Sequence, residues 1–169
     1  LEVDIPSGVR EIGASAYSGC FKVERIVFSP YSTLSVISDD AFSYCTNIKI
    51  VSIPDSLRRI GSQAFSYCTS LETVVIGWSS TLISIGGNSF CGCSSLETIN
   101  IPSSVESIGS GTFEGCESLK YVYYDGKSSP KWHYIFAKYT HLIIPLQYEG
   151  DELRSEERRV GKECRSRWS

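Results

Sequence analysis

Methionine is absent from the chain of 169 residues, which begins with Leu1, so we expect a fragment or a processed chain. No charged-then-apolar segment of the kind that directs secretion opens it. No apolar run approaches the ~18 residues of a membrane-spanning helix, so membrane insertion of this chain is not expected. The chain also has no large excess of positive or negative charge. The formal net charge is −3, which argues against unaided binding to a nucleic-acid backbone.

The chain also lacks the motifs that carry catalysis. It contains no G-x-S-x-G motif of serine hydrolases, no H-E-x-x-H motif of zinc proteases and no Walker loop for binding phosphate. Cys91 and Cys93 form a C-x-C pair, but no second pair and no nearby His completes a zinc site. His133 and His141 are the only histidines, and we interpret them as surface residues. We therefore expect no enzyme activity, no cofactor and no metal.

A repeat runs through most of the chain. Five cysteines follow one another at intervals of 25, 23, 25 and 23 residues, and the same residue types precede each of them. An aromatic residue stands three positions before the cysteine, a small residue four before, Ile eight before, and Leu or Val eleven before. Such registry is typical of a solenoid, in which stacked units share one core. The cysteines are Cys20, Cys45, Cys68, Cys93 and Cys116.

Each unit opens with alternating apolar residues, most clearly at 96–102 (LETINIP). Alternation with period two predicts a short half-buried strand, and Pro102 ends it because proline donates no ladder hydrogen bond. The Ile-Gly pairs, such as Ile60-Gly61, predict a turn. The stretch from there to the cysteine is too short for a long helix, so we expect turns or a short 3₁₀ segment. Five units and one further strand give six parallel strands.

The pattern Leu-x-x-Ile-x-Ile-Pro, then Ile-Gly, Ala-Phe and Cys, is carried best by Ile53-Pro54, Ile60-Gly61, Ala64-Phe65 and Cys68. It resembles the BspA-like, or Treponema pallidum-type, leucine-rich repeat over residues 1 to about 124. The alternation of 23 and 25 residues resembles the versions common in anaerobic protozoa. The resemblance implies a leucine-rich-repeat horseshoe with short parallel strands on the concave face and turns or short 3₁₀ segments on the convex face.

Three parts are expected along the chain. Residues 1–118 hold five repeats, the first of them truncated, and residues 119–153 hold a terminal strand and an aromatic-rich cap. Residues 154–169 contain six Lys or Arg and three Glu. This tail resembles a sequencing adapter translated in frame, so we expect it to be disordered and non-native. A native basic tail is the alternative.

The cysteine column predicts a ladder of interior thiols, one in each layer. Strands stack about 4.8 Å apart, whereas the Cβ atoms of a disulfide lie about 3.8 Å apart, so we expect reduced thiols. Buried cysteine packs as a small hydrophobe. We therefore interpret Cys20, Cys45, Cys68, Cys93 and Cys116 as structural, with redox or metal function as the alternative.

The outward face of the strands is the candidate binding surface, since successive strand side chains point to opposite faces. Val27, Ile50 and Val75 predict an apolar strip with acidic residues at one end and tyrosines at the other. An ordinary sheet surface is the alternative, because strands favour β-branched residues in general. The candidate residues, two per strand, are Arg25, Val27, Ile50, Ser52, Thr73, Val75, Thr98, Asn100, Tyr121 and Tyr123.

These observations predict a non-enzymatic module that binds a protein or peptide. The resemblance implies part of a secreted or surface-exposed adhesin, with a host or matrix protein as the ligand. An intracellular or purely structural leucine-rich-repeat scaffold, with cytoplasmic localisation, is the alternative. Neither interpretation involves nucleic acid or membrane insertion of this chain.

Overall fold

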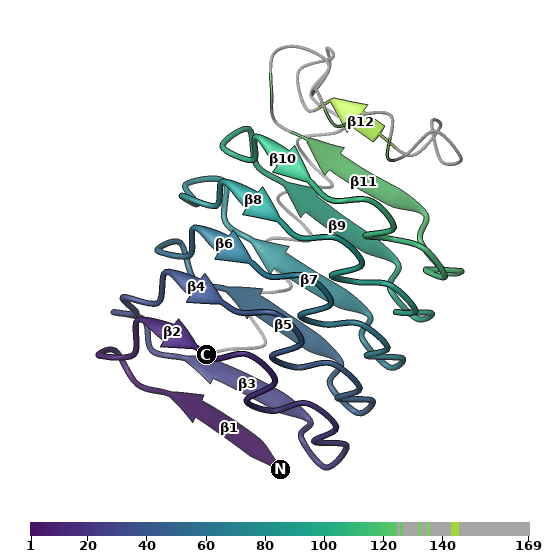
Figure 1. Ribbon diagram of the computed structural model, residues 1–169. Coiled ribbons are helices and arrows are strands. Elements are labelled where there is room, and N and C mark those ends of the chain that lie inside the picture. The colour runs from purple at the N-terminus through teal and green to yellow at the C-terminus, as the bar shows by residue number, and fades with distance from the viewer. Residues whose placement is uncertain (125, 127–131, 133–134, 136–142, 146–169) are drawn as a thin grey trace, which may run out of the picture.

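The computed structural model describes residues 1–124, 126, 132, 135 and 143–145 (Figure 1). Within them the chain winds into a solenoid in which each repeat adds one long and one short strand. The tail at 154–169, the two histidines and most of the expected cap lie outside the described residues. The adapter interpretation therefore stays a prediction.

The long strands form one parallel sheet. In spatial order they are β1 (Glu2–Ile5), β3 (Arg25–Phe28), β5 (Ile50–Ile53), β7 (Thr73–Ile76), β9 (Thr98–Ile101), β11 (Tyr121–Tyr124) and β12 (Ile143–Pro145). Equivalent residues of neighbouring repeats are paired, for example Ile50 with Thr73. The expected number of six was wrong, because β12 from the C-terminal segment pairs with β11 as a seventh strand.

A second parallel sheet stands where the sequence predicted only turns. Its strands are β10 (Ser107–Ile108), β8 (Ser84–Ile85), β6 (Arg59–Ile60), β4 (Val36–Ile37) and β2 (Glu11–Ile12). Each contains two residues and ends at the isoleucine of the repeat. Stacking explains the difference: each segment lies beside its copy in the next layer, so even two extended residues find a partner for their backbone groups.

The segments between each short strand and the cysteine are turns, and residues 1–124 contain no α- or 3₁₀-helix. Two positions per repeat, five and one before the cysteine, have left-handed backbone angles, which interrupt any helix. Every second backbone N–H group there reaches the next repeat, as in the 2.8 Å bond from Phe42 to the carbonyl of Ala64. The left-handed residues are Ser15, Gly19, Asp40, Tyr44, Gln63, Tyr67, Asn88, Gly92, Gly111 and Gly115.

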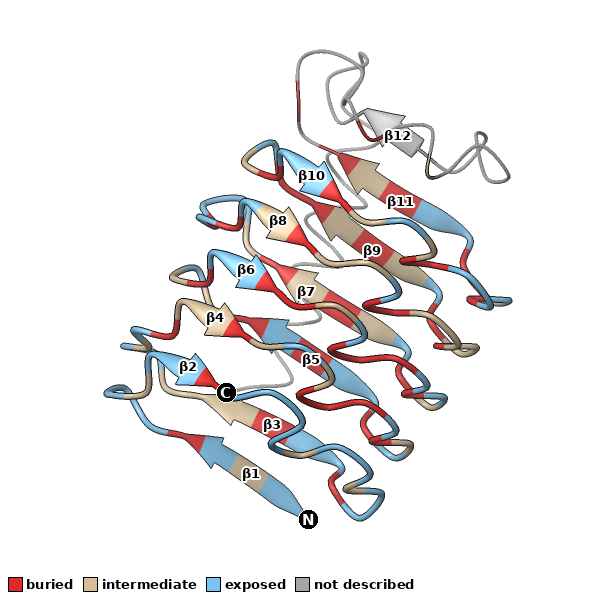
Figure 2. Cartoon of the chain, in the orientation of Figure 1, coloured by how far each residue is buried: buried red, intermediate tan, exposed pale blue. Residues whose placement is uncertain are grey.

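The core is a set of columns running along the solenoid, and Figure 2 shows buried positions alternating with exposed or half-buried ones along β5, β7, β9 and β11. The aromatic column is one continuous stack with centroids 5.1, 5.3, 5.6 and 5.8 Å apart, formed by Tyr17, Phe42, Phe65, Phe90 and Phe113. Val9, Tyr17 and Cys20 are only half-buried. The first described layer has a neighbour on one side only, so the expectation of a buried Cys20 was wrong.

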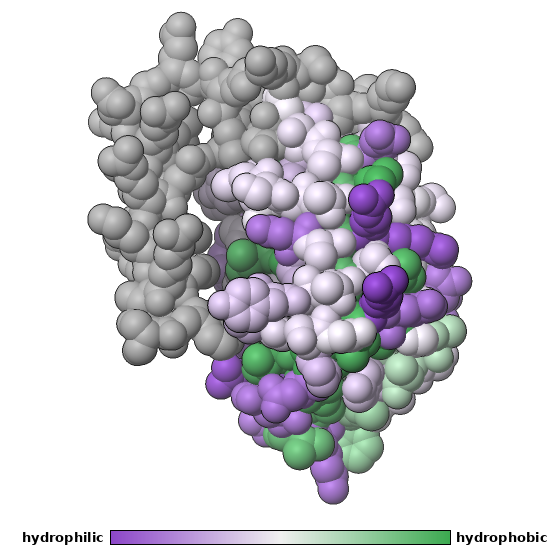
Figure 3. Space-filling view, turned by 90° about the vertical axis from the view of Figure 1, so that its left-hand side faces the viewer, coloured by the Kyte–Doolittle hydropathy of each residue, from purple (hydrophilic) through white to green (hydrophobic). Residues whose placement is uncertain are grey.

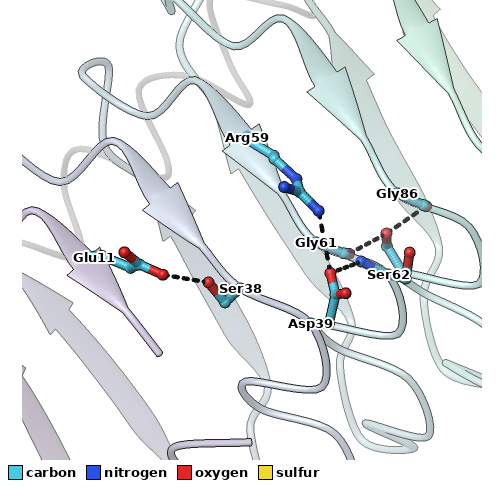
Figure 4. A network of polar contacts seen from close by, with 8 residues as sticks. Glu11, Ser38, Asp39, Arg59, Gly61, Ser62 and Gly86 are labelled. Atoms are coloured by element: carbon cyan, nitrogen blue, oxygen red, sulfur yellow. Dashed lines mark hydrogen bonds and ion pairs between the residues drawn. The ribbon is translucent and has the colours of Figure 1, made fainter. Parts of the chain in front are cut away.

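Polar contacts join successive layers beside the second sheet (Figure 4). The carboxylate of Asp39 accepts the N–H of Ser62 at 2.8 Å and lies 3.3 Å from the guanidinium of Arg59. One layer earlier, the hydroxyl of Ser38 donates to Glu11 at 2.7 Å. Because these partners are more than half exposed, their ion pair adds little stability, and they act mainly by fixing the turns.

An aromatic pair packs against the last repeat. Trp132 is buried, its indole N–H donates to the carbonyl of Val105 at 3.0 Å, and its ring meets Tyr124 edge-on at 5.2 Å. An aromatic side chain that satisfies its own N–H is well suited to close the last repeat. Trp132 lies within the aromatic-rich segment that the sequence analysis assigned to a cap.

Candidate protein-binding surface

All ten candidate residues lie on the outward face of the seven-stranded sheet, with buried residues alternating between them (Figure 2). Their exposure is uneven. Arg25, Ile50, Ser52 and Tyr121 are exposed, whereas the other six are half-buried: Val27, Thr73, Val75, Thr98, Asn100 and Tyr123. Strand alternation, which the sequence showed, is what brings them together.

The apolar strip is less regular than the sequence suggested. The strand register places Ile50 between Arg25 and Thr73, whereas Val75 lies in the neighbouring row beside Ser52. The three apolar side chains therefore form a zigzag across two rows that polar residues interrupt. The register of the strands, and not the alternation within each strand, decides this arrangement.

Arg25 is already paired on the surface. Its guanidinium lies 3.5 Å from the carboxylate of Glu2, its register partner on β1. Both side chains are about half exposed, at 54% and 46%, so the pair is screened by solvent. A ligand carboxylate would compete with Glu2 for this cation.

Asn100 is engaged with the sheet itself. The ladder between β7 and β9 ends at Val74 and Ile99, one residue short of Asn100. The Asn100 carboxamide continues it, because its oxygen accepts the N–H of Ile76 at 3.0 Å and its amide donates to the carbonyl of Ile76. Asn100 thus serves strand pairing, a role that no sequence pattern signalled.

Two tyrosines occupy the C-terminal end of the surface. Tyr121 and Tyr123, on β11, have ring centroids 6.1 Å apart and planes inclined by 28°. Tyr121 is 45% exposed, whereas Tyr123 is half-buried. Aromatic side chains of this kind supply contact area with few rotatable bonds, which suits an interface anchor.

Burial disfavours the reactive form of four thiols in the column. Four of the five cysteines are buried, and burial raises the pKa of Cys45 to about 11 and of Cys116 to about 12. Burial also raises the pKa values of Cys68 and Cys93 well above the ordinary value. Thiolates are the reactive form, so these groups are inert in the folded chain. Within the described residues no cluster of His, Cys, Asp or Glu could hold a metal ion.

Two exposed aromatic side chains, Tyr31 and Trp78, were missed because they lie outside the repeat columns. They belong to the stretches that make the second and fourth repeats two residues longer than their neighbours. The alternation between 25 and 23 residues was the sequence signal that marked these stretches.

A family model also matches this chain. The match agrees with the repeat columns, the two parallel sheets and the absence of helix from residues 1–124. Six copies of the BspA type leucine rich repeat region match residues 1–120 and 76–145. The chain belongs to the BspA-type leucine-rich repeat family. Its fold class, a repeat solenoid with short parallel strands, is thereby confirmed.

Solved leucine-rich repeat structures are similar over most of this chain. The T. pallidum leucine rich repeat protein is 33% identical with a TM-score of 0.67, over 72% of this chain and 57% of that one. The pneumococcal vaccine antigen PcpA is 31% identical with a TM-score of 0.68, over 73% of this chain and 30% of that one.

A leucine rich cell surface protein from Faecalibacterium prausnitzii is 28% identical with a TM-score of 0.58. It matches over 76% of this chain and 40% of that one, so this BspA-type chain spans only part of each relative. No curated protein matches the sequence. Among the described residues, no helix has the length and apolar character needed to traverse a bilayer.

Proposed function

We propose that this BspA-type chain is a non-enzymatic binding module that holds a protein or peptide against the outward face of its seven-stranded sheet. The observation that carries the proposal is the set of side chains that β1 to β11 present in register, two per long strand. Each of the long strands β3, β5, β7, β9 and β11 is paired on both sides, so the frame is rigid and little ordering entropy is lost on binding.

The surface favours an extended macromolecular partner over a small metabolite. Contact area comes from the apolar zigzag of Val27, Ile50 and Val75, and the paired rings of Tyr121 and Tyr123 provide the anchor. Interface energy concentrates on a few aromatic residues, so the tyrosine end of the sheet contributes most of the affinity.

The whole protein is proposed to act at the cell surface or after secretion, as an adhesin-like molecule that contacts host or matrix proteins. One similar structure is a leucine rich cell surface protein and another a pneumococcal vaccine antigen, which supports this setting.

Site-specific photo-crosslinking tests the proposed face. A photoreactive side chain at Ser52, exposed on β5, captures a protein partner that the same group at Thr69, exposed on a turn between repeats, does not. Each captured protein is identified by mass spectrometry and then purified. Equal capture from Thr69, or capture from Thr69 alone, contradicts the proposal.

Affinity for that purified partner gives the second measurement. Tyr121→Ala with Tyr123→Ala weakens binding by at least ~2 kcal/mol, because both anchor rings are lost. Circular dichroism and the melting temperature show whether the variant is folded. If the double variant is folded and its affinity is unchanged, the partner does not bind the outward face of the sheet as proposed.

A further inference from the structure

Two loops in alternate repeats have the same conformation. They are the loops at residues 29–33 and 77–81, called the long loops, which follow β3 and β7. In each, the N–H of Ser32 or Ser80 donates to the carbonyl three residues back, at 2.9 and 3.0 Å. The hydroxyl oxygen of the same serine accepts the N–H two residues on, at 3.2 Å in both loops. The two loops therefore share the hydrogen bonds of this serine.

Both long loops are fixed to the layer beneath them. The hydroxyl of Thr33 donates to the carbonyl of Ser7 at 2.6 Å, and that of Thr81 donates to the carbonyl of Asp55 at 2.8 Å. The N–H groups of the same threonines reach the same carbonyls at 3.2 and 2.9 Å. Paired bonds of this kind hold the tips of the loops in place and limit the entropy lost when a ligand binds.

Each tip carries one exposed aromatic side chain, at the third residue of the first loop and at the second residue of the second loop. Tyr31 is 83% exposed and Trp78 is 45% exposed. The shorter loop at 54–56 lies in the layer between them, so the two aromatic loops are two strand spacings apart, or about 9.6 Å. Figure 3 looks onto this edge, where apolar patches alternate with polar ones on the described surface.

A carboxylate lies between the two aromatic loops. Asp55 is exposed, and its side chain contacts the place that a Cβ on Gly77 would occupy, at the start of the second long loop. Among the ion pairs of the described residues, none joins Asp55 to Arg58, the nearest cation in the sequence. The edge therefore presents an aromatic ring, an unneutralised negative charge and a second aromatic ring in consecutive layers.

We propose that this edge binds a proline-rich segment that carries a Lys or Arg, in the polyproline II conformation. Such a helix has three residues per turn and a rise of 3.1 Å, so its proline faces repeat every ~9.3 Å, close to the spacing of the two loops. Proline-rich segments dock on aromatic rings in this preformed conformation. Tyr31 and Trp78 contact successive turns, and Asp55 pairs with the cation.

This interaction goes beyond the proposed function. It uses the loop edge of the solenoid, whereas the outward sheet face lies on the long strands, so either proposal can fail alone. The partner is a peptide segment recognised by conformation and one positive charge. A glycan, which also stacks on aromatic rings, is an outcome of the test.

Calorimetry with synthetic peptides tests the proposal on the full chain. The probe is a 12-residue peptide with Pro at every third position and a single Arg, and the matched peptide has Gly in place of each Pro. We expect saturable binding of the first and none of the second. Trp78→Ala and Tyr31→Ala each weaken binding at least tenfold, and Trp78→Phe keeps it. Asp55→Asn weakens it several-fold and removes most of its salt dependence.

Tyr44→Gly is the matched control, since it removes an exposed ring elsewhere and three repeats already have Gly at that position. It should bind the peptide as the native chain does. Equal binding of the glycine peptide, an equal loss in Tyr44→Gly, or no saturable binding overturns the proposal. Binding of a soluble oligosaccharide with the same dependence on Trp78, without peptide binding, also overturns it.

Discussion

The interior cysteines act through hydrogen bonds as well as through volume. From the second repeat onward, each thiol donates to the carbonyl of the aromatic residue in the previous repeat. The thiol of Cys68 reaches the carbonyl of Phe42 at 3.2 Å, and that of Cys93 reaches the carbonyl of Phe65 at 3.1 Å. A small apolar side chain with a weak donor suits this position, because it fills the slot and ties two layers together.

Cys68→Ser should lower the free energy of unfolding by about 1–3 kcal/mol. The hydroxyl is smaller and more polar than the thiol, so it leaves a gap and costs more to bury. Urea denaturation followed by circular dichroism measures the change.

The control for this variant is Cys91→Ser, at a thiol that is only half-buried. Its effect should stay within about 0.5 kcal/mol, as for most substitutions near the surface. Equal stability of Cys68→Ser and the native chain would show that the column needs only a small donor.

The buried thiols should also make the free energy of unfolding fall at alkaline pH. The pKa of Cys45 is raised to about 11 from an ordinary value of 9.0, chiefly because burial disfavours the thiolate. Below pH 9 the thiol is protonated in the folded and the unfolded chain, so stability is fully present. Between pH 9 and 11 the unfolded chain releases the proton first, and stability should fall as the pH rises.

Urea midpoints at pH 7, 9, 10 and 10.5 measure this dependence. Cys45→Ala should show a shallower fall over pH 9–10.5 than the native chain, since one of the titrating groups is gone. Identical slopes for the two chains would contradict the assignment to the thiol.

The elements of the solenoid approach one another most closely beside the second sheet. Gly86 follows β8, and a Cβ there would lie 2.5 Å from the backbone nitrogen of Ser62 and 2.6 Å from the carbonyl carbon of Gly61. Backbone atoms cannot move aside as a flexible side chain can. The Ile-Gly pair of the repeat is therefore a packing requirement between layers, in addition to a turn signal.

Gly86→Ala should destabilise the chain by about 1–3 kcal/mol, the usual cost of overpacking, or prevent folding. Gly13 occupies the same repeat position in the first layer, where nothing lies within 4 Å of an added Cβ. Gly13→Ala should therefore be tolerated. Thermal unfolding of both variants decides the matter, and equal melting temperatures would contradict the steric explanation.

At the scale of the whole molecule, stability is shared between neighbouring layers. Parallel ladders, aromatic stacking and thiol bonds all join adjacent repeats, so contacts between layers are the main source of stability. In the first layer, which has one neighbour, Val9, Tyr17 and Cys20 are only half-buried, so the core is covered less completely there.

Deletion of residues 154–169 should leave the melting temperature unchanged within error. None of the repeat columns extends into this basic tail, so we expect no layer to depend on it. Differential scanning calorimetry of the full and shortened chains measures the difference. A drop of several degrees would show that the tail packs against the folded chain.

The repeat columns determined the solenoid, the parallel long strands and the alternation that places the ten candidate residues on one face. Periodicity is sufficient for this, because each unit buries the same positions against the next. The sequence also indicated that the cysteines form an interior column. It did not reveal the second sheet, since two-residue strands leave no pattern of their own and exist only beside a neighbouring layer.

Only the tertiary structure decided how those residues are used. Strand register places Ser52 beside Val75 and Arg25 beside Glu2, with which it forms an ion pair. The carboxamide of Asn100 hydrogen-bonds to the backbone of the neighbouring strand. The matching conformations of the two long loops likewise depend on hydrogen bonds to another repeat. Periodicity fixes which residues face the same way, whereas contacts between residues 20 or more positions apart depend on register and loop geometry, which the chain acquires only when the layers stack.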